Sequence, residues 1–434
     1  MSCSQCPVTK SSDAFDLNTS TTQHLRFLPI SFKGEQGGFM RILFFIILLD
    51  IAGFGILLPS IMFVLENMGA GPAYASIIIA TYSIGQFIAG PFWGALSDRI
   101  GRKPVLAIAL SGALLAYIIM IYAKTPEMIL LSRAFAGLMA GNIATAYAAI
   151  ADLTTPKDRA KGMGVLGAAF GLGFVVGPAI GGYLGGATPE TANIVYPAIA
   201  SAVFSMMAIL AILFLFKETL DESHRQEILA RPRVTRLQAI KKVAAHPILI
   251  TFCLFIFLVS TTGALMDPVT PLLVGNRYGW GPEQMGHIFV IVGICIIIVQ
   301  GGLVGRMAKA FGEKNMVRIA LLSLISGLAL IIYTPISYGV VLGFCLTGIG
   351  STLFTTGISA LASHRAAPHE RGLVMGVIQS MQSLGRSTGP LFAGGLFVIW
   401  QGLPYSVGIV LVTIALIWMS LLIKGGEIED VQRP

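Results

Sequence analysis

The stretch that decides the fold is Gly94-Ala-Leu-Ser-Asp-Arg-Ile-Gly-Arg-Lys-Pro104, a short charged turn between two long apolar runs. Glycine lets the chain reverse direction within a few residues, and the turn sets one carboxylate and several cations beside the apolar runs. A weaker copy, Gly305-Arg-Met-Ala-Lys-Ala-Phe-Gly-Glu-Lys314, occurs in the second half of the chain. A charged turn that recurs in this way indicates a duplicated architecture.

The composition around these turns is that of a membrane protein. The chain has 434 residues, of which 55% are hydrophobic and 12% charged, and its mean hydropathy is +0.80. Soluble domains have roughly 45–50% apolar and about 25% charged residues. At about 20 residues per span, the chain can cross a bilayer about a dozen times. These values argue against a soluble enzyme.

We predict an all-α membrane protein with twelve transmembrane helices in two six-helix bundles. The apolar runs lie near 41–64, 74–96, 104–122, 128–152, 161–184, 194–216, 247–274, 284–305, 316–334, 338–362, 372–399 and 403–423. Strands would leave backbone groups unpaired in lipid or would alternate in polarity, so helices are expected. The predicted organisation is a polar tail (1–36), a first bundle (37–216), a linker (217–246), a second bundle (247–423) and a tail (424–434).

The distribution of Lys and Arg predicts the orientation. All but four of the 29 basic residues fall on one side if both tails and the even-numbered connections share that side. The exceptions are Lys124 and Arg277 on the opposite side, and Arg133 and Arg386 within spans. The positive-inside rule therefore places both termini in the cytoplasm. We expect a multi-pass protein of the cell membrane.

An internal repeat supports the two-bundle prediction. The landmarks that align are Asp158-Arg159 with Glu370-Arg371, Met163-Gly164 with Met375-Gly376, Gly177-Pro178 with Gly389-Pro390, and Pro59 with Pro271. Paired six-helix halves suit a transporter that rocks about a site at the membrane midplane. The alternative is that similar loops merely recur at similar spacing.

The turn at 94–104 resembles, almost residue for residue, the signature loop between helices two and three of the major facilitator superfamily. The resemblance implies a gating latch on the cytoplasmic side, made of Gly94, Asp98, Arg99, Gly101, Arg102 and Lys103, with Asp152 pairing Arg102 or Arg99. Asp98 could also favour the positive N-terminal end of helix eleven, near Arg371. In the second copy Lys309 and Glu313 replace Asp98 and Arg102, so a second latch would work differently. The alternative role of the loop is a positive-inside signal alone.

The fifth span resembles the antiporter motif of the same superfamily. It reads Gly173-Phe-Val-Val-Gly177-Pro178-Ala-Ile-Gly181-Gly182. A small-residue face interrupted by proline suits tight packing where a helix bends. The resemblance favours export over uptake, whereas the alternative is a purely packing role for Gly173, Gly177, Pro178 and Gly181.

Asp50 lies about nine residues, or roughly 13 Å, inside the first span. A charge at this depth is costly and indicates function by default. Arg133 in the fourth span is its natural partner, because Gly137 and Gly141 beside it let helices approach closely. We expect Asp50 and Arg133 to couple transport to protons, with Asp50 neutral when buried alone and ionised when Arg133 or water reaches it. The alternative is a permanent Asp50–Arg133 pair that pins two helices together.

Arg386 lies about 14 residues inside the eleventh span, on the same face as Gln379 and Gln382. Such a cation suits a carboxylate, phosphate or zwitterionic substrate, or would neutralise Asp50 across the cavity. The alternatives are a pair with Asp267, which we place at a helix end near the outer surface, or a water-filled crevice. The remaining residues predicted to line the substrate cavity are Tyr82, Gln86 and Asn142.

Several other classes of function find no support in the sequence. It has no Walker loop, HExxH motif, zinc-ligand spacing or nucleophile elbow, so we expect no enzyme activity, catalytic residue, cofactor or metal. Cys3 and Cys6 form a lone CxxC without a second pair. Basic residues sit in short clusters, which argues against a nucleic-acid partner. The expected partners are a small-molecule substrate, protons and the lipid bilayer, and we expect a monomer.

Together these motifs resemble the twelve-span drug:proton antiporter branch, and most of all tetracycline/proton antiporters over residues 41–216. One departure leaves the substrate open, because those antiporters carry an acid beside a tyrosine in helix three, where this chain has Ala116-Tyr117. The predicted function is proton-coupled efflux of small, amphiphilic, drug-like molecules by alternating access. The alternative is a metabolite or siderophore carrier, a symporter or facilitator, for an anionic substrate. A membrane receptor is a third possibility, against which the intact signature loop argues.

Overall fold

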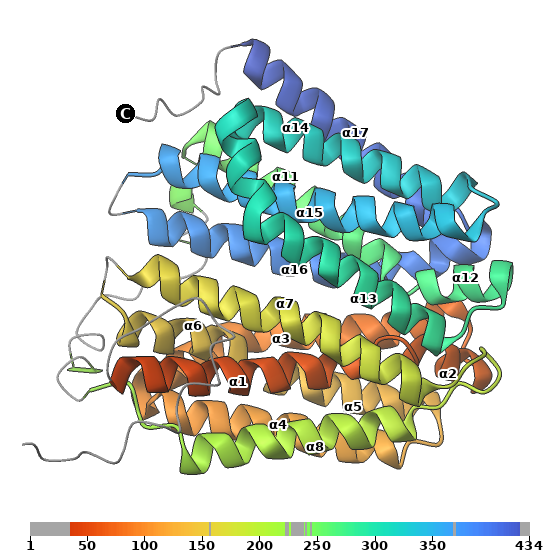
Figure 1. Ribbon diagram of the computed structural model, residues 1–434, viewed down its shortest axis with the longest axis horizontal. Coiled ribbons are helices and arrows are strands. Elements are labelled where there is room, and N and C mark those ends of the chain that lie inside the picture. The colour runs from red at the N-terminus through yellow and green to blue at the C-terminus, as the bar shows by residue number, and fades with distance from the viewer. Residues whose placement is uncertain are drawn as a thin grey trace, which may run out of the picture.

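The structure is a computed structural model that describes residues 35–155, 158–221, 225–226, 238, 241–243, 245–367 and 370–425. Within these ranges the regular elements are helices, and no strand occurs (Figure 1). The CxxC of Cys3 and Cys6, most of the predicted linker and the tail from residue 426 lie outside the described residues.

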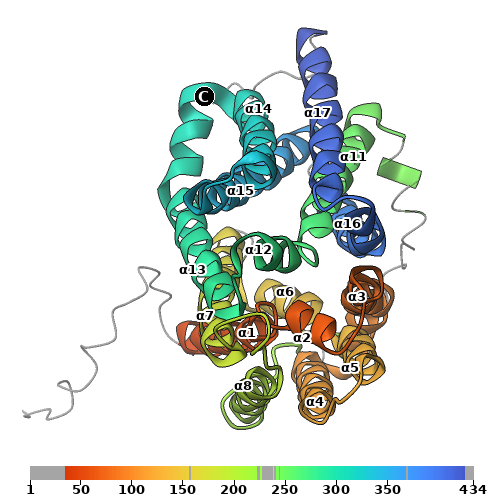
Figure 2. The ribbon, with the colours of Figure 1, turned by 90° about the vertical axis from the view of Figure 1, so that its right-hand side faces the viewer.

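The helices form two groups, which Figure 2 shows end-on. The first contains α1 (Glu35–Ile56), α2 (Ile61–Asn67), α3 (Pro72–Ile100), α4 (Arg102–Ile121), α5 (Pro126–Met139), α6 (Asn142–Leu153), α7 (Arg159–Gly185) and α8 (Val195–Phe214). The second contains α11 (Pro247–Met266), α12 (Thr270–Tyr278), α13 (Pro282–Ile298), the π-helix η1 (Val299–Leu303), α14 (Val304–Tyr333), α15 (Ser337–Arg365), α16 (Arg371–Ile399) and α17 (Leu403–Lys424).

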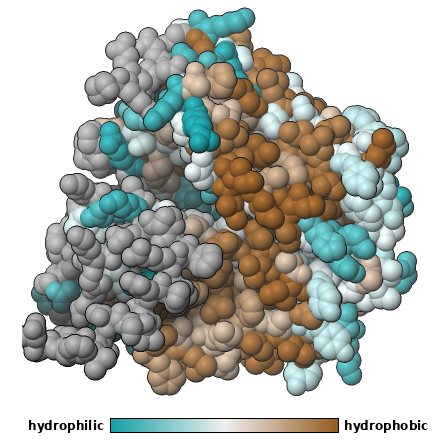
Figure 3. All heavy atoms as spheres, viewed as in Figure 1, coloured by the Kyte–Doolittle hydropathy of each residue, from teal (hydrophilic) through white to brown (hydrophobic). Residues whose placement is uncertain are grey.

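Ten segments of the described chain are long and apolar enough to cross a membrane. One of them, Pro282–Tyr333, covers two predicted spans. Gly312 separates the two spans, since it interrupts α14 with a non-helical φ of 76°. The remaining predicted span is α16, whose 29 residues include polar and charged side chains. Figure 3 shows hydrophobic side chains in a band across the middle of the helices. The fold is therefore the all-α, multi-pass membrane architecture that the sequence predicts.

Three predicted spans are broken into two helices each. The first breaks between α1 and α2, the fourth between α5 and α6, and the seventh between α11 and α12. Pro59 lies in the first break and Pro268 in the third, as expected of a residue that cannot continue a helix. Breaks at membrane depth bring helix ends and polar groups to an internal site.

Trp93 of α3 packs against the break in the fourth span, where its ring occupies the space that a Cβ at Gly141 would need. Its indole Nε1 donates a hydrogen bond of 2.7 Å to the Leu138 carbonyl. Trp93 thus satisfies a backbone acceptor just before the break, where helical hydrogen bonding ends.

The two charged turns share one backbone feature. Gly101 has a φ of 102° and Gly312 a φ of 76°, in the region that glycine enters without steric penalty. The two copies of the turn therefore keep this conformation although their charges differ.

The two halves pack together at one end only. We call the end where α1 begins and α17 ends the tail end, and the opposite end, which holds α2 and α12, the far end (Figure 1). At the far end one apolar core includes Leu57 and Ile61 from the first half and Leu265 and Leu272 from the second. Toward the tail end each half has its own separate core.

Close backbone contacts confirm the packing at the far end. A Cβ added to Gly182 of α7 would lie 2.7 Å from the Gly286 Cα of α13, and the Glu283 N–H donates to the Gly186 carbonyl at 3.1 Å. Near the tail end of α7, by contrast, a Cβ on Gly164 would meet no atom within 4 Å. The halves are thus closed against each other at the far end and separated at the tail end.

Candidate functional site

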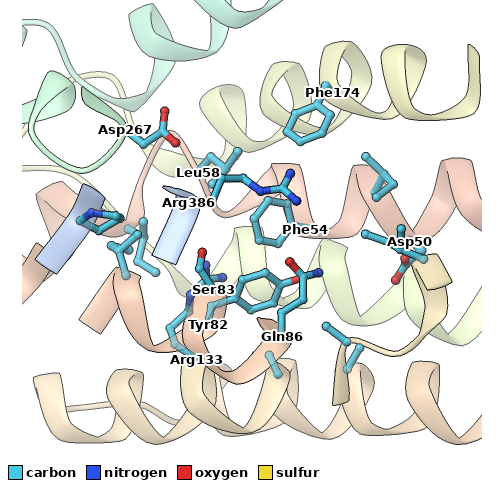
Figure 4. A pocket seen from close by; sticks show the side chains of 18 of the residues that line it. Asp50, Phe54, Leu58, Tyr82, Ser83, Gln86, Arg133, Phe174, Asp267 and Arg386 are labelled. Atoms are coloured by element: carbon cyan, nitrogen blue, oxygen red, sulfur yellow. The ribbon is translucent and has the colours of Figure 1, made fainter. Parts of the chain in front are cut away.

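A central cavity of about 300 Å³ lies between the halves (Figure 4). Its polar lining comprises Asp50, Tyr82, Ser83, Gln86, Tyr117, Arg133, Asn142, Asp267 and Arg386. Much of the rest is aromatic or aliphatic, with Phe54, Phe170, Phe174 and Phe289 among the lining residues. The structure thus brings together most of the residues expected to line a substrate cavity. Gln379 and Gln382 lie outside it, because they precede Arg386 on α16 toward the tail end.

Asp50 is held by the broken fourth span. Its carboxylate is only 7% exposed, and its Oδ2 accepts a hydrogen bond from the Asn142 side-chain amide. Asn142 is the first residue of α6, and its own Oδ1 accepts the Ile143 N–H at 2.9 Å. The break therefore sets a neutral donor and a helix N-terminus, which carries partial positive charge, against a carboxylate inside the membrane.

Arg133 does not pair with Asp50 in this conformation. It is 3% exposed, and its guanidinium carbon lies 4.6 Å from the centre of the Tyr82 ring and 5.4 Å from that of Phe54. Such cation–π contacts stabilise a desolvated cation in part, yet its Nε makes no hydrogen bond. The expected Asp50–Arg133 pair is not formed in this conformation, because the Asp50 carboxylate bonds Asn142 and the Arg133 guanidinium contacts aromatic rings. The alternative of a permanent pair is therefore not met either.

Arg386 and Asp267 face the same cavity from the second half. Arg386 is exposed there, and its Nη2 reaches Ser383 Oγ at 3.5 Å. Over the described ranges no ion pair joins Arg386 to Asp267. Asp267 ends α11, as the sequence predicts, and the break between α11 and α12 lets it line the cavity. The sequence reading did not place it in the cavity.

At the tail end Arg102 ties the signature loop together. It is 2% exposed; its Nη1 lies 2.6 Å from Asp98 Oδ1 and its Nε 2.8 Å from Asp152 Oδ2. The partner of Asp152 is thus Arg102, while Arg99 is exposed. Asp98 bonds within its own half, and a Cβ on Gly372 at the start of α16 would meet nothing within 4 Å. The expected approach of Asp98 to helix eleven is absent because the halves are apart here.

Glu218, just beyond α8, is a residue of this loop that the sequence reading missed. Its carboxylate accepts the backbone N–H groups of Arg102 at 2.8 Å and Lys103 at 3.0 Å, which lie at the start of α4. A Cβ on Gly101 would lie 2.8 Å from the Glu218 carboxyl carbon, so a side chain there would displace this carboxylate. An acid after an apolar helix gives no sequence signal that it caps a distant helix.

The glycines of the antiporter-like motif face α1. Cβ atoms on Gly173, Gly177 and Gly181 would overlap Ile51, Ala52 and Ile56, respectively. Pro178 also packs on α1, where a Cβ on Gly55 would lie 2.9 Å from the Pro178 Cδ. The motif thus joins α7 to α1 backbone against backbone, while Gly182 next to it contacts the other half.

Comparison with known proteins settles the family. The family model described as Major Facilitator Superfamily matches residues 43–337 and 256–430. The chain belongs to the major facilitator superfamily. It is 28% identical to the Escherichia coli tetracycline resistance protein, class B, over 379 residues, which cover 85% of this chain and 92% of that protein. It is 27% identical to multidrug resistance protein 2 of Bacillus subtilis (strain 168), over 84% of this chain and 90% of the relative.

A solved structure shares the fold of this superfamily member. The human organic anion transporter MFSD10 superposes with a TM-score of 0.64 at 23% sequence identity, over 89% of this chain and 100% of that chain. The family, the apolar helices and the cavity between two halves together make the chain a membrane transporter.

The first prediction concerns the contact of α7 with α1 in this superfamily member. Gly177→Ala should lower the melting temperature of the purified protein, because the new Cβ would lie 2.5 Å from the Ala52 carbonyl oxygen, and overpacking costs about 1–3 kcal/mol. Gly164→Ala on the same helix is the matched control, since its Cβ meets nothing within 4 Å. Equal melting temperatures for the two variants would contradict the packing role.

Proposed function

We propose that this superfamily member is a proton-coupled exporter of small, amphiphilic, drug-like molecules. The observation that carries the proposal is the buried Asp50 carboxylate on a largely apolar cavity between the two halves. The names of the tetracycline and multidrug resistance relatives point in the same direction. In this proposal residues 37–216 and 247–423 are the rocking bundles, 217–246 is a cytoplasmic linker, and both tails are cytoplasmic in the cell membrane.

With the tail end in the cytoplasm, the present conformation is inward-facing. Substrate reaches the cavity from the cytoplasm as Asp50 releases its proton there. The halves then close at the tail end and part at the far end, and substrate leaves as Asp50 takes a proton from outside. Alternation of this kind exposes one fixed site to each side in turn.

Asp50 suits this role because its hydrogen-bond partner is neutral. The Asn142 amide donates to Asp50 Oδ2, and an amide N–H can bond a carboxyl oxygen in either protonation state. Loss or gain of the proton therefore leaves no buried counter-charge unpaired. Arg133, which belongs to the same half as Asp50, lines the same cavity.

A second candidate function is transport of an organic anion. Arg133 and Arg386 both line the cavity, and no carboxylate of the described chain lies within ion-pair distance of either. Two such cations favour an anionic substrate group entering the cavity. This candidate uses the same fold and the same alternation.

The test of both candidates is proton movement in liposomes. Purified protein is reconstituted with a pH-sensitive dye inside, a proton gradient is imposed, and lipophilic cations or organic anions are added. We expect proton flux when lipophilic cations are added. Flux with anions alone would favour the second candidate, and transport without proton flux would overturn coupling in both.

A further inference from the structure

A second cavity, of about 180 Å³, lies within the second half and adjoins the central cavity. The two cavities share Asp267 and Phe289 in their linings. The walls of this side cavity come from α11 to α15 and are mostly apolar, with Met266, Met285 and Phe344 among them. Asp267, at the mouth between the two cavities, is the only charged residue that lines the side cavity over the described ranges.

Three threonine hydroxyl groups around the side cavity donate their hydrogens to backbone carbonyls. Thr262 Oγ1 donates to the Leu258 carbonyl at 3.0 Å, Thr270 Oγ1 to Met266 at 2.8 Å, and Thr347 Oγ1 to Phe344 at 2.9 Å. A threonine has one hydroxyl hydrogen, so these oxygens can offer a ligand only lone pairs, and Thr270 Oγ1 already contacts the Tyr405 hydroxyl at 2.9 Å. Together with the carboxylate, they suit a ligand group that donates hydrogen bonds and carries positive charge.

The Asp267 carboxylate is available to such a ligand. The residue is exposed at the cavity, and no Lys, Arg or His of the described ranges lies within ion-pair distance of it. Arg386 is the cation that lines the central cavity with it from the second half, and Arg133 lines the same cavity from the first. A carboxylate bound to an ammonium group in a partly apolar site makes a charge-assisted hydrogen bond.

We propose that Asp267 and the side cavity form a subsite for lipophilic amines. The ammonium group binds the Asp267 carboxylate, and the hydrocarbon part packs against the apolar wall of the side cavity. The inference deepens the proposed function, on which it rests for the role of the cavity, by naming a substrate class. Asp50 then serves the proton and Asp267 the substrate charge, on opposite halves of the protein.

Three probes with one hydrocarbon skeleton test the subsite. They are 4-phenylbutylamine, the neutral 4-phenylbutan-1-ol and the anionic 4-phenylbutyrate, each measured by equilibrium binding to the purified full chain at pH 7. We expect the wild type to bind the amine more tightly than the alcohol. Asp267→Asn should weaken amine binding about tenfold or more, the scale of one charge-assisted hydrogen bond, and leave alcohol binding unchanged.

One control variant separates this carboxylate from others. Glu283→Gln removes an acid of α13 that lines neither cavity and should keep the preference for amine over alcohol. The inference is overturned if the wild type shows no such preference, if Glu283→Gln abolishes it, or if Asp267→Asn weakens both ligands equally.

A cavity-filling variant tests where the hydrocarbon lies. Ser351 lines the side cavity from α15 and does not line the central one. Ser351→Phe should weaken amine and alcohol alike, whereas Ser351→Ala should weaken neither. Unchanged binding by Ser351→Phe would place the ligand in the central cavity and overturn the side-cavity assignment.

The binding assay needs neither a proton gradient nor transport. Amine selectivity that depends on Asp267, found in a protein that moves no protons, would therefore sustain the subsite and refute proton coupling. Substrate-driven proton movement that persists in Asp267→Asn, together with unchanged amine affinity, would refute the subsite and support proton coupling.

Discussion

Asp50→Asn is expected to abolish substrate-driven proton movement while the protein stays folded. Asparagine has the shape of aspartate, and its amide oxygen can still accept the hydrogen bond from Asn142, so the contact between α1 and α6 is kept. What disappears is the only group at that position that can carry a proton. We expect proton flux in reconstituted liposomes to fall about hundredfold, the scale of a lost proton-transfer group.

The matched control is Glu66→Gln, which removes an exposed acid of α2 outside both cavities. It should transport protons like the wild type. Substrate binding to Asp50→Asn should persist, because the aromatic lining and Asp267 are untouched. Normal proton flux per substrate in Asp50→Asn would show that another group couples transport.

Arg102→Ala is expected to destabilise the protein strongly. Arg102 is buried, and the Asp152 side chain to which it bonds at 2.8 Å is only 7% exposed. Removing the arginine leaves that carboxylate buried without its cation, and breaking a buried pair from one side costs roughly 3 to 5 kcal/mol. Asp98, whose side chain is 35% exposed, contributes less, because water can solvate it.

The measurement is the thermal melting temperature of the purified variant, with Arg99→Ala as control. Arg99 belongs to the same loop and carries the same charge but is exposed, so its loss should change the melting temperature little. Arg102→Ala combined with Asp152→Ala should recover part of the loss, because no carboxylate is then stranded. If Arg99→Ala and Arg102→Ala melt alike, the loop acts only through its positive charge.

The charges within the spans show how far sequence reasoning reaches into the site. Asp50, Arg133 and Arg386 could be found because each interrupts an apolar run, and all three line one cavity. Their partners could not be found in the same way. Arg133 contacts the Tyr82 ring and not Asp50, since the direction of a side chain depends on how two helices are rotated against each other.

The sequence by itself determined the architecture, an all-α membrane protein of apolar spans in two related halves, and it narrowed the partner of Asp152 in the signature loop to Arg102 or Arg99. These features follow from the solvent, because lipid demands long apolar helices and makes each internal charge conspicuous. Only the tertiary structure decided that Trp93 packs on the break in the fourth span, that Asn142 holds Asp50, that Glu218 caps α4 and that Asp267 lines two cavities. Each of these depends on contacts between segments far apart in the chain, and the order of residues within one helix carries no record of which neighbour its faces will meet.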